Sequence, residues 1–175
     1  MIKIKDIVKK AKRGNLDAFL ELFYSYKDQL YRTAFFYTGN TDDALDVIQE
    51  TAYRAFKNIN SLNHDSYAKT WMTRITINCS IDLLKSKKKI IPIESEFLES
   101  ISYEDEDVLM SVTLDQLMDI LHEREKSIII LKCYHGYIFK EIAKMLELPL
   151  STVKSHYYRS LEKLRKHAER TEFHE

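Results

Sequence analysis

Four polar side chains near the C-terminus recur at the spacing of one helix face and could contact nucleic acid. They are Lys154, Ser155, Tyr158 and Arg159. Residues four apart lie on the same side of an α-helix, so two cations and two hydroxyl groups would be presented together. Cations neutralise phosphates, and such donors bind base edges. The spacing favours a DNA-reading helix, and a helical hairpin with a solvated basic face is the alternative.

The segment 136–165 supplies the element that would position these side chains. It reads as two short helices around a tight turn, and the second helix of such a helix-turn-helix usually enters a major groove. We expect Ser151 to cap the second helix, leaving Thr152 and the first free amides to face a phosphate. The apolar stripe expected to pack against a core is Val153, Tyr157, Leu161 and Leu164.

A second polar face lies on a helix that we predict from Thr41 to about Asn58. Thr41 is the expected N-cap, and acidic residues in the first turn complement the helix dipole. An acidic face is commonly just solvated, and this alternative stays open on the residues alone. The polar face consists of Asp42, Asp46, Gln49 and Glu50.

A third helix is predicted from Tyr67 to Lys85, after the polar stretch 58–66. Trp71 and Arg74 place an aromatic ring beside a cation, and Lys85 begins a basic run. Aromatic rings next to cations suit the unstacked bases of a single strand. The alternative is that Trp71 belongs to the core and Arg74 pairs with a carboxylate.

Composition and charge patterning indicate an all-α protein with two small helical domains. Three Gly and two Pro leave little material for the turns of a β protein, and one further helix is expected over 16–36. The formal net charge is zero, but 90–110 holds seven acidic residues and no Lys or Arg. Lacking a sustained helical period, this acidic segment is predicted to be an extended linker between the domains. Beyond it, helices are expected around 114–121 and 128–131.

Several function classes have no support in the sequence. Cys79 and Cys133 lack metal-ligand spacing and are expected to be two buried thiols in a reduced cytosol. No catalytic set or phosphate-cradling loop is visible, so we expect no enzyme activity, no metal and no cofactor. The absence of a signal peptide and of a membrane-spanning stretch predicts a cytoplasmic protein with no direct membrane insertion.

Three motifs in order resemble the extracytoplasmic-function sigma factors of bacterial RNA polymerase. They are DDALDVIQET at 42–51, TWMTRITINCSIDLLK at 70–85 and GYIFKEIAKMLELPLSTVKSHYYRS at 136–160. The resemblance implies a sigma region 2 helical bundle at 1–87, an acidic linker at 88–110 and a sigma region 4 helix-turn-helix bundle at 111–175. A stand-alone helix-turn-helix regulator is the alternative, but it leaves the first two motifs without a role.

The same resemblance implies partners and roles for the residues named above. The partners are core RNA polymerase, through its β′ and β subunits, promoter DNA, and an anti-sigma factor that is commonly membrane-anchored. The activity would answer envelope or other extracytoplasmic stress. The acidic helix at 41–58 would dock on the β′ coiled coil, and the implied docking residues are Asp42, Asp43, Asp46, Gln49 and Glu50. The implied minus-10 residues are Asn63, His64, Trp71, Arg74, Asn78 and Lys85. The implied minus-35 residues are Thr152, Lys154, Ser155, Tyr158 and Arg159.

Overall fold

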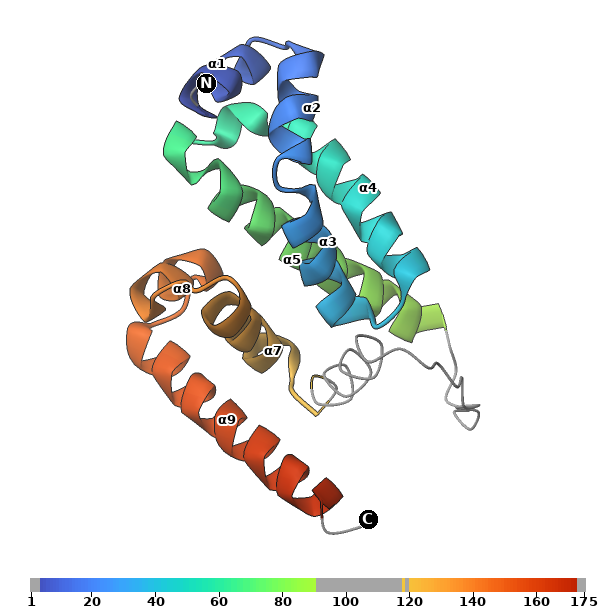
Figure 1. The fold of residues 1–175 in the computed structure, drawn as a ribbon, viewed down its shortest axis with the longest axis vertical. Coiled ribbons are helices and arrows are strands. Elements are labelled where there is room, and N and C mark those ends of the chain that lie inside the picture. The colour runs from blue at the N-terminus through green and yellow to red at the C-terminus, as the bar shows by residue number, and fades with distance from the viewer. Residues whose placement is uncertain (1–3, 91–117, 119, 173–175) are drawn as a thin grey trace. The chain divides into compact units, whose positions relative to one another are not determined.

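The computed structural model describes residues 4–90, 118 and 120–172, and every regular element in these ranges is helical. The expected all-α fold is therefore confirmed. The chain divides into two compact units, 1–90 and 91–175, each described by itself below (Figure 1). The acidic segment from 91 to 110 and the apolar positions 114 and 117 lie outside the described residues.

The first unit packs its helices around one apolar core. α3, α4 and α5 lie against one another, while α1 packs on α2 and on the turns that precede α5. Leu22, Leu30 and Met72 are among the fully buried side chains of this core. Its elements are α1 (Ile4–Lys12), α2 (Leu16–Tyr24), α3 (Lys27–Thr38), α4 (Thr41–Lys57), two 3₁₀ turns (Ile59–Ser61 and Asp65–Tyr67) and α5 (Ala68–Ile90).

The prediction of a single helix over 16–36 is wrong, because the helix is interrupted between α2 and α3. The Ser25 hydroxyl donates to the carbonyl of Leu22 at 2.6 Å, and the Ser25 amide donates to Glu21. Ser favours such local bonds over continued helix. Phe23 and Leu30 are buried on the two sides of the break. The apolar spacing thus runs across the break and conceals it.

The bounds of α4 match the prediction to within one residue, but its cap is different. Asn40, not Thr41, is the N-cap: its side-chain oxygen accepts from the Asp43 amide at 2.9 Å. α5 continues to Ile90, beyond the expected end at Lys85. The first residues assigned to the linker, 88–90, are therefore helical.

The second unit contains the expected helix-turn-helix. Its core includes Ile128, Ile142 and Val153, each fully buried. The Glu125 carboxylate joins α7 to α9 by accepting from Lys163 Nζ at 2.8 and 2.9 Å. The elements described here are α7 (Glu123–Ile129), a π-helical turn (Ile130–Tyr134), α8 (Phe139–Leu146) and α9 (Leu150–Glu172).

Candidate nucleic-acid interface

α9 presents four of its five predicted DNA-contacting residues at the surface. Lys154, Ser155, Tyr158 and Arg159 are exposed, and Thr152 in the first turn is half-buried. Val153, on the opposite side of the helix, is fully buried. The helix is therefore two-faced, with the donors outside and the apolar anchor inside.

The buried side of α9 differs from the predicted stripe at one position. Leu161 is 38% exposed, whereas Ser160 is fully buried. The Ser160 hydroxyl donates to the carbonyl of His156 at 2.7 Å, so its polar group is satisfied within the helix. Ser160 follows Val153 by seven residues, almost two full turns, and so returns to the buried face of the helix. Leu161 follows by eight residues and lies past that face. Counting in steps of four placed Leu161 inside wrongly.

The turn between α8 and α9 holds its acidic residue in a left-handed conformation. Glu147 has φ 54° and ψ 43°, and it is the one non-glycine residue with positive φ in the described part of the chain. Its amide donates to the carbonyl of Ala143, which also accepts from the Leu148 amide at 3.0 Å. A left-handed conformation at a residue other than glycine strains the backbone of this turn.

The start of α9 corrects the predicted N-cap. The helix already includes Leu150, and the carbonyl of Pro149 accepts the first helical bond, from the Val153 amide at 3.1 Å. Ser151 therefore lies inside the first turn and does not cap it. Thr152 follows in the same turn, near the free amides that can bind a phosphate.

An aromatic cluster that sequence reasoning missed surrounds the exposed ring of Tyr158. The ring centroids of Phe139 and Tyr157 lie 6.4 and 5.4 Å from that of Tyr158, and the two rings contact each other edge-on. Lys132 Nζ lies 5.0 Å from the Phe139 centroid. Burial and the neighbouring Cys133 raise the pKa of Tyr157. Contacts with these rings fix the direction in which the side chain of Tyr158 projects from the helix.

Three predicted residues of α5 lie at the surface, and one does not. Arg74, Asn78 and Lys85 are exposed, whereas Trp71 is half-buried and packs against the core of the first unit. Positions 74, 78 and 85 keep helical spacing, so they share one side of α5. Trp71 thus matches the alternative in which the indole belongs mainly to the core.

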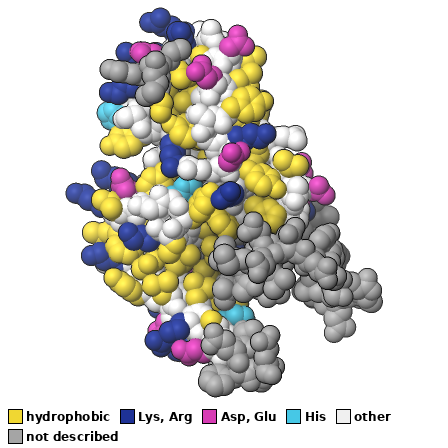
Figure 2. Space-filling model, viewed as in Figure 1, with side chains coloured by type: hydrophobic (Ala, Val, Ile, Leu, Met, Phe, Trp, Pro, Cys, Tyr) yellow, Lys and Arg dark blue, Asp and Glu magenta, His cyan; other side chains and the backbone are white. Residues whose placement is uncertain are grey.

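The loop before α5 exposes the two other predicted residues of this interface. Asn63 and His64 are exposed, and the His64 ring lies 5.9 Å from that of Tyr67. Lys12 of α1 anchors the loop, because its Nζ donates to the Leu62 carbonyl at 2.6 Å and to Asp65 Oδ1 at 2.7 Å. Lys and Arg side chains gather around this α1 end of the first unit (Figure 2).

The four residues of the predicted polar face of α4 are exposed, whereas Asp43, a docking residue implied by the resemblance, is buried. Asp42, Asp46, Gln49 and Glu50 are exposed. Asp43 is 7% exposed and accepts hydrogen bonds from Asn40 and Lys87. These two bonds lower the pKa of Asp43, Asn40 having the larger effect. Asp43 does not share the outer face and instead fixes the start of the helix.

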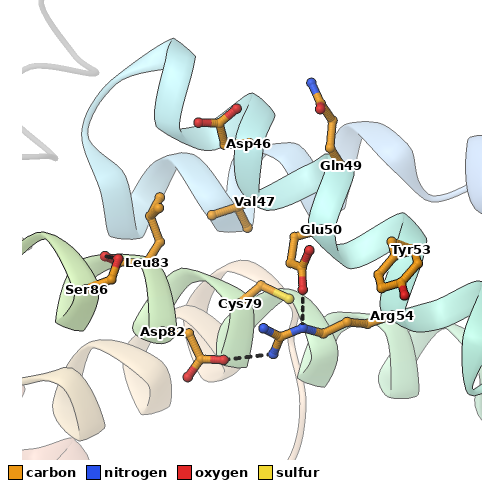
Figure 3. A pocket seen from close by; sticks show the side chains of 10 residues that line it. All are labelled: Asp46, Val47, Gln49, Glu50, Tyr53, Arg54, Cys79, Asp82, Leu83 and Ser86. Atoms are coloured by element: carbon orange, nitrogen blue, oxygen red, sulfur yellow. Dashed lines mark hydrogen bonds and ion pairs between the residues drawn. The ribbon is translucent and has the colours of Figure 1, made fainter.

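An open groove of about 690 Å³ runs between α4 and α5. Arg54 crosses it, donating to Glu50 at 2.6 Å and to Asp82 at 2.7 Å, while Asp46 and Gln49 point outward (Figure 3). The two carboxylates raise the pKa of the Arg54 guanidinium, Asp82 more than Glu50. Glu50 is therefore partly neutralised, and Asp42, Asp46 and Gln49 are the more available members of the outer face.

Comparison with known proteins decides the family. The family described as Sigma-70 region 2 matches residues 22–90, and Sigma-70, region 4, matches 111–164. The RNA polymerase sigma factor SigV of Bacillus subtilis is 34% identical, with 80% of this chain and 84% of that protein covered. The ECF RNA polymerase sigma factor SigW of the same species is 30% identical, with 93% and 95% covered. The chain belongs to the extracytoplasmic-function sigma factors.

Solved structures share the fold of this sigma factor. CnrH, solved in complex with the cytosolic domain of CnrY, gives a TM-score of 0.74 at 21% identity, covering 94% of this chain and 96% of that one. RpoE of Bartonella quintana, solved with the anti-sigma factor NepR, gives 0.69 at 20% identity, covering 86% and 96%. The sigma factor is thus a transcription initiation factor of the kind that directs RNA polymerase to specific promoters.

The remaining sequence predictions concern thiols, metals and membranes. Cys79 is buried as predicted, but Cys133 is exposed, so the prediction of two buried thiols is wrong for Cys133. Within the described residues, no group of His, Cys, Asp or Glu is arranged to hold a metal ion. None of the helices in the described part of the chain has the length and apolar character needed to traverse a bilayer.

Proposed function

We propose that the two units of the sigma factor divide promoter recognition between them. The second unit, region 4, reads the minus-35 element through α9, and the first unit, region 2, binds polymerase and the minus-10 element. The observation that carries the proposal is the two-faced α9, in which Val153 is buried while Lys154, Ser155, Tyr158 and Arg159 are exposed. A helix anchored in this way can lie in a major groove with its donors toward the bases.

The outer face of α4 is the proposed docking site for the β′ coiled coil of core polymerase. Asp42, Asp46 and Gln49 are exposed, and neither of the two carboxylates forms an ion pair among the described residues. Glu50 is exposed as well and pairs with Arg54. Exposed carboxylates without an ion pair are available to a basic partner, and such charge complementarity favours rapid and specific association. Asp43 supports this face from within.

The 58–67 loop and the exposed side of α5 are the proposed minus-10 surface. Asn63 and His64 come from the loop, while Arg74, Asn78 and Lys85 come from the helix. Extruding a base from the duplex costs a few kcal/mol, which contacts to the flipped base can offset. Tyr67, 57% exposed beside His64, offers a ring on which such a base can stack. Trp71 supports α5 from the core.

Regulation by an anti-sigma protein, in response to extracytoplasmic stress, completes the proposal. Two structures of the same fold were solved as complexes, CnrH with the cytosolic domain of CnrY and RpoE with the anti-sigma factor NepR. We place the sigma factor in the cytoplasm, with the polymerase that it serves. It acts there by binding and carries out no chemical step of its own.

Start-site mapping tests the proposed function. The purified chain is mixed with core polymerase and a genomic promoter library, and the transcripts are sequenced. We expect start sites that depend on the chain and that share upstream elements near minus-35 and minus-10. A stand-alone regulator would form no stable holoenzyme and would direct no initiation, and this result would overturn the proposal.

A further inference from the structure

We propose that α1 and the turn after it form a second phosphate-binding surface, which contacts the DNA backbone beside the minus-10 element. The surface consists of Lys5, Lys9 and Arg13, all exposed. The inference rests on the proposed assignment of the 58–67 loop to minus-10 DNA. Its occupant is the sugar–phosphate backbone of the promoter, whose regular negative charge the three cations can neutralise.

Two of the three cations, Lys5 and Lys9, lie on one side of α1, and Arg13 follows in the turn after the helix. The cations of this row are four residues apart, and Lys12 lies on the same side because seven residues from Lys5 complete nearly two turns. Like charges at this spacing destabilise an isolated helix. Lys9 and Lys12 in the last turn also favour the helix dipole, so the two local effects oppose each other, and the buried face of Ile7, Val8 and Ala11 supplies the packing that stabilises α1.

Lys12 connects this row directly to the minus-10 loop. Its ammonium group donates to the Leu62 carbonyl at 2.6 Å and to Asp65 at 2.7 Å, next to the exposed Asn63 and His64. The side of α1 that carries the row therefore borders the loop. DNA held by the loop would have its backbone continue past the cations of α1.

The charges of the row remain available to a partner. Among the described residues, no ion pair involves Lys5, Lys9 or Arg13. Asp6 is the one acidic residue of α1, and Lys10 adds another exposed cation. Basic side chains gather over this end of the unit (Figure 2), although the whole chain has zero formal net charge. The local excess of positive charge therefore suits a polyanion.

The same features argue against a membrane surface as the partner. A helix that lies on a bilayer inserts an exposed apolar face between the lipids. In α1 the apolar residues Ile7, Val8 and Ala11 are buried against the rest of the unit and cannot insert, and among the apolar residues of the helix Ile4 alone is exposed, which makes no apolar face. The cations alone face solvent along the row, an arrangement that fits a hydrophilic backbone.

Salt dependence of promoter binding tests the inference with a matched pair of variants. Holoenzyme is assembled from purified core polymerase and the full chain, and its affinity for a promoter found by start-site mapping is measured at several salt concentrations. Lys9→Gln/Arg13→Gln removes two charges from the row. Lys27→Gln/Arg32→Gln removes the same residue types from exposed positions of α3. Core-polymerase affinity and circular dichroism are measured for both variants.

We expect the Lys9/Arg13 variant to bind core normally and to lose about 1.5 from the slope of log affinity against log salt, because each phosphate contact contributes about 0.7 to 0.9. The α3 variant should keep the wild-type slope. An unchanged slope in the α1 variant, or an equal loss in both, would overturn the inference. The inference would also be overturned if the wild type bound anionic lipid vesicles, the α1 variant alone lost that binding, and the salt slope of its promoter binding were unchanged. If the wild-type holoenzyme initiates normally, these results overturn the inference and leave the proposed function standing; failure of the wild type to initiate overturns both.

Discussion

The ammonium group of Lys87 lies 2.6 Å from both carboxylate oxygens of Asp43. This contact joins the C-terminal part of α5 to the first turn of α4, and Asn40 donates to the same carboxylate at 2.8 Å. The carboxylate is buried, whereas the Lys87 side chain is 49% exposed. The pair thus orients the helix whose outer face we assign to polymerase binding.

Replacing Asp43 should destabilise the first unit. Asp43→Asn loses the charge that binds Lys87, and a partly exposed pair together with a weakened capping network is worth about 1 kcal/mol. The free energy of unfolding, measured by urea denaturation, should fall by that amount. Asp42→Asn, one residue away and exposed, serves as the control and should change stability by less than about 0.5 kcal/mol.

The stability contributed by Asp43 should depend on pH. Hydrogen bonds from Asn40 and then Lys87 lower the folded-state pKa of Asp43 below its ordinary value near 3.9. A lowered pKa means that the contribution is present above the unfolded-state pKa and is lost as the pH falls through the folded-state pKa. The difference in unfolding free energy between wild type and Asp43→Asn should therefore shrink between about pH 5 and pH 2. A constant difference across that range would contradict this account.

Replacing Glu125 should destabilise the second unit more than replacing Lys163, its partner in an ion pair. Glu125 is 4% exposed, binds Lys163 and also accepts from the His122 amide at 3.1 Å. The Lys163 side chain is 40% exposed. Glu125→Ala should cost the second unit about 2 kcal/mol, because it also leaves a helix-terminal amide without its partner. Lys163→Ala should cost less, because it removes a side chain that is already partly exposed and leaves Glu125 its hydrogen bond from the His122 amide; equal losses in thermal unfolding would be evidence against this asymmetry.

Glycine should stabilise the turn of the helix-turn-helix. Glu147 adopts φ 54°, a conformation that costs L-residues about 1 kcal/mol and costs glycine little. Glu147→Gly should therefore raise the unfolding free energy of the second unit by up to about 1 kcal/mol. Lys144→Gly, inside α8 and exposed, is the matched control and should lower it by a similar amount. A loss of stability in both variants would mean that Glu147 is not strained.

Phe139 should act on promoter binding through Tyr158. The two rings lie 6.4 Å apart, and Tyr157 contacts both. Phe139→Ala should weaken binding to a minus-35 DNA fragment several-fold, because Tyr158 loses a ring that restricts its direction. In a Tyr158→Ala background the same substitution should have almost no further effect. Additive effects in this double-mutant cycle would contradict the positioning role.

The sequence predicted elements well where a single apolar stripe lay between clear turn signals. The bounds of α4 were predicted to within one residue. Its start could be predicted because Gly39 ends α3 with φ 68°, and its end because the polar Asn58 follows the last turn. The break at Ser25 was missed because the apolar spacing continues through it. The cap at Asn40 was missed because Thr41, also a good capping residue, follows it directly.

Site residues were predictable as helix faces but not as individual contacts. The exposure of Lys154 and Arg159 was predictable, because cations opposite a buried Val153 follow from helical spacing. Asp43 was included among the docking residues through the resemblance, and nothing in the sequence indicated that Lys87, forty-four residues later, binds its carboxylate. Lys12 gave no signal, since its anchoring role depends on a contact fifty residues away.

The central claim, that region 4 reads the minus-35 element while region 2 holds the polymerase, is tested most directly with Arg159→Ala. Arg165→Ala, on the same helix and paired with Glu169, is the matched control. Core-polymerase affinity and run-off transcription are measured for both variants on a promoter found by start-site mapping. We predict that Arg159→Ala reduces transcription at least several-fold, consistent with about 1 to 3 kcal/mol per base contact, and leaves core affinity unchanged. Loss of core binding, or transcription equal to that of the control, would contradict the account.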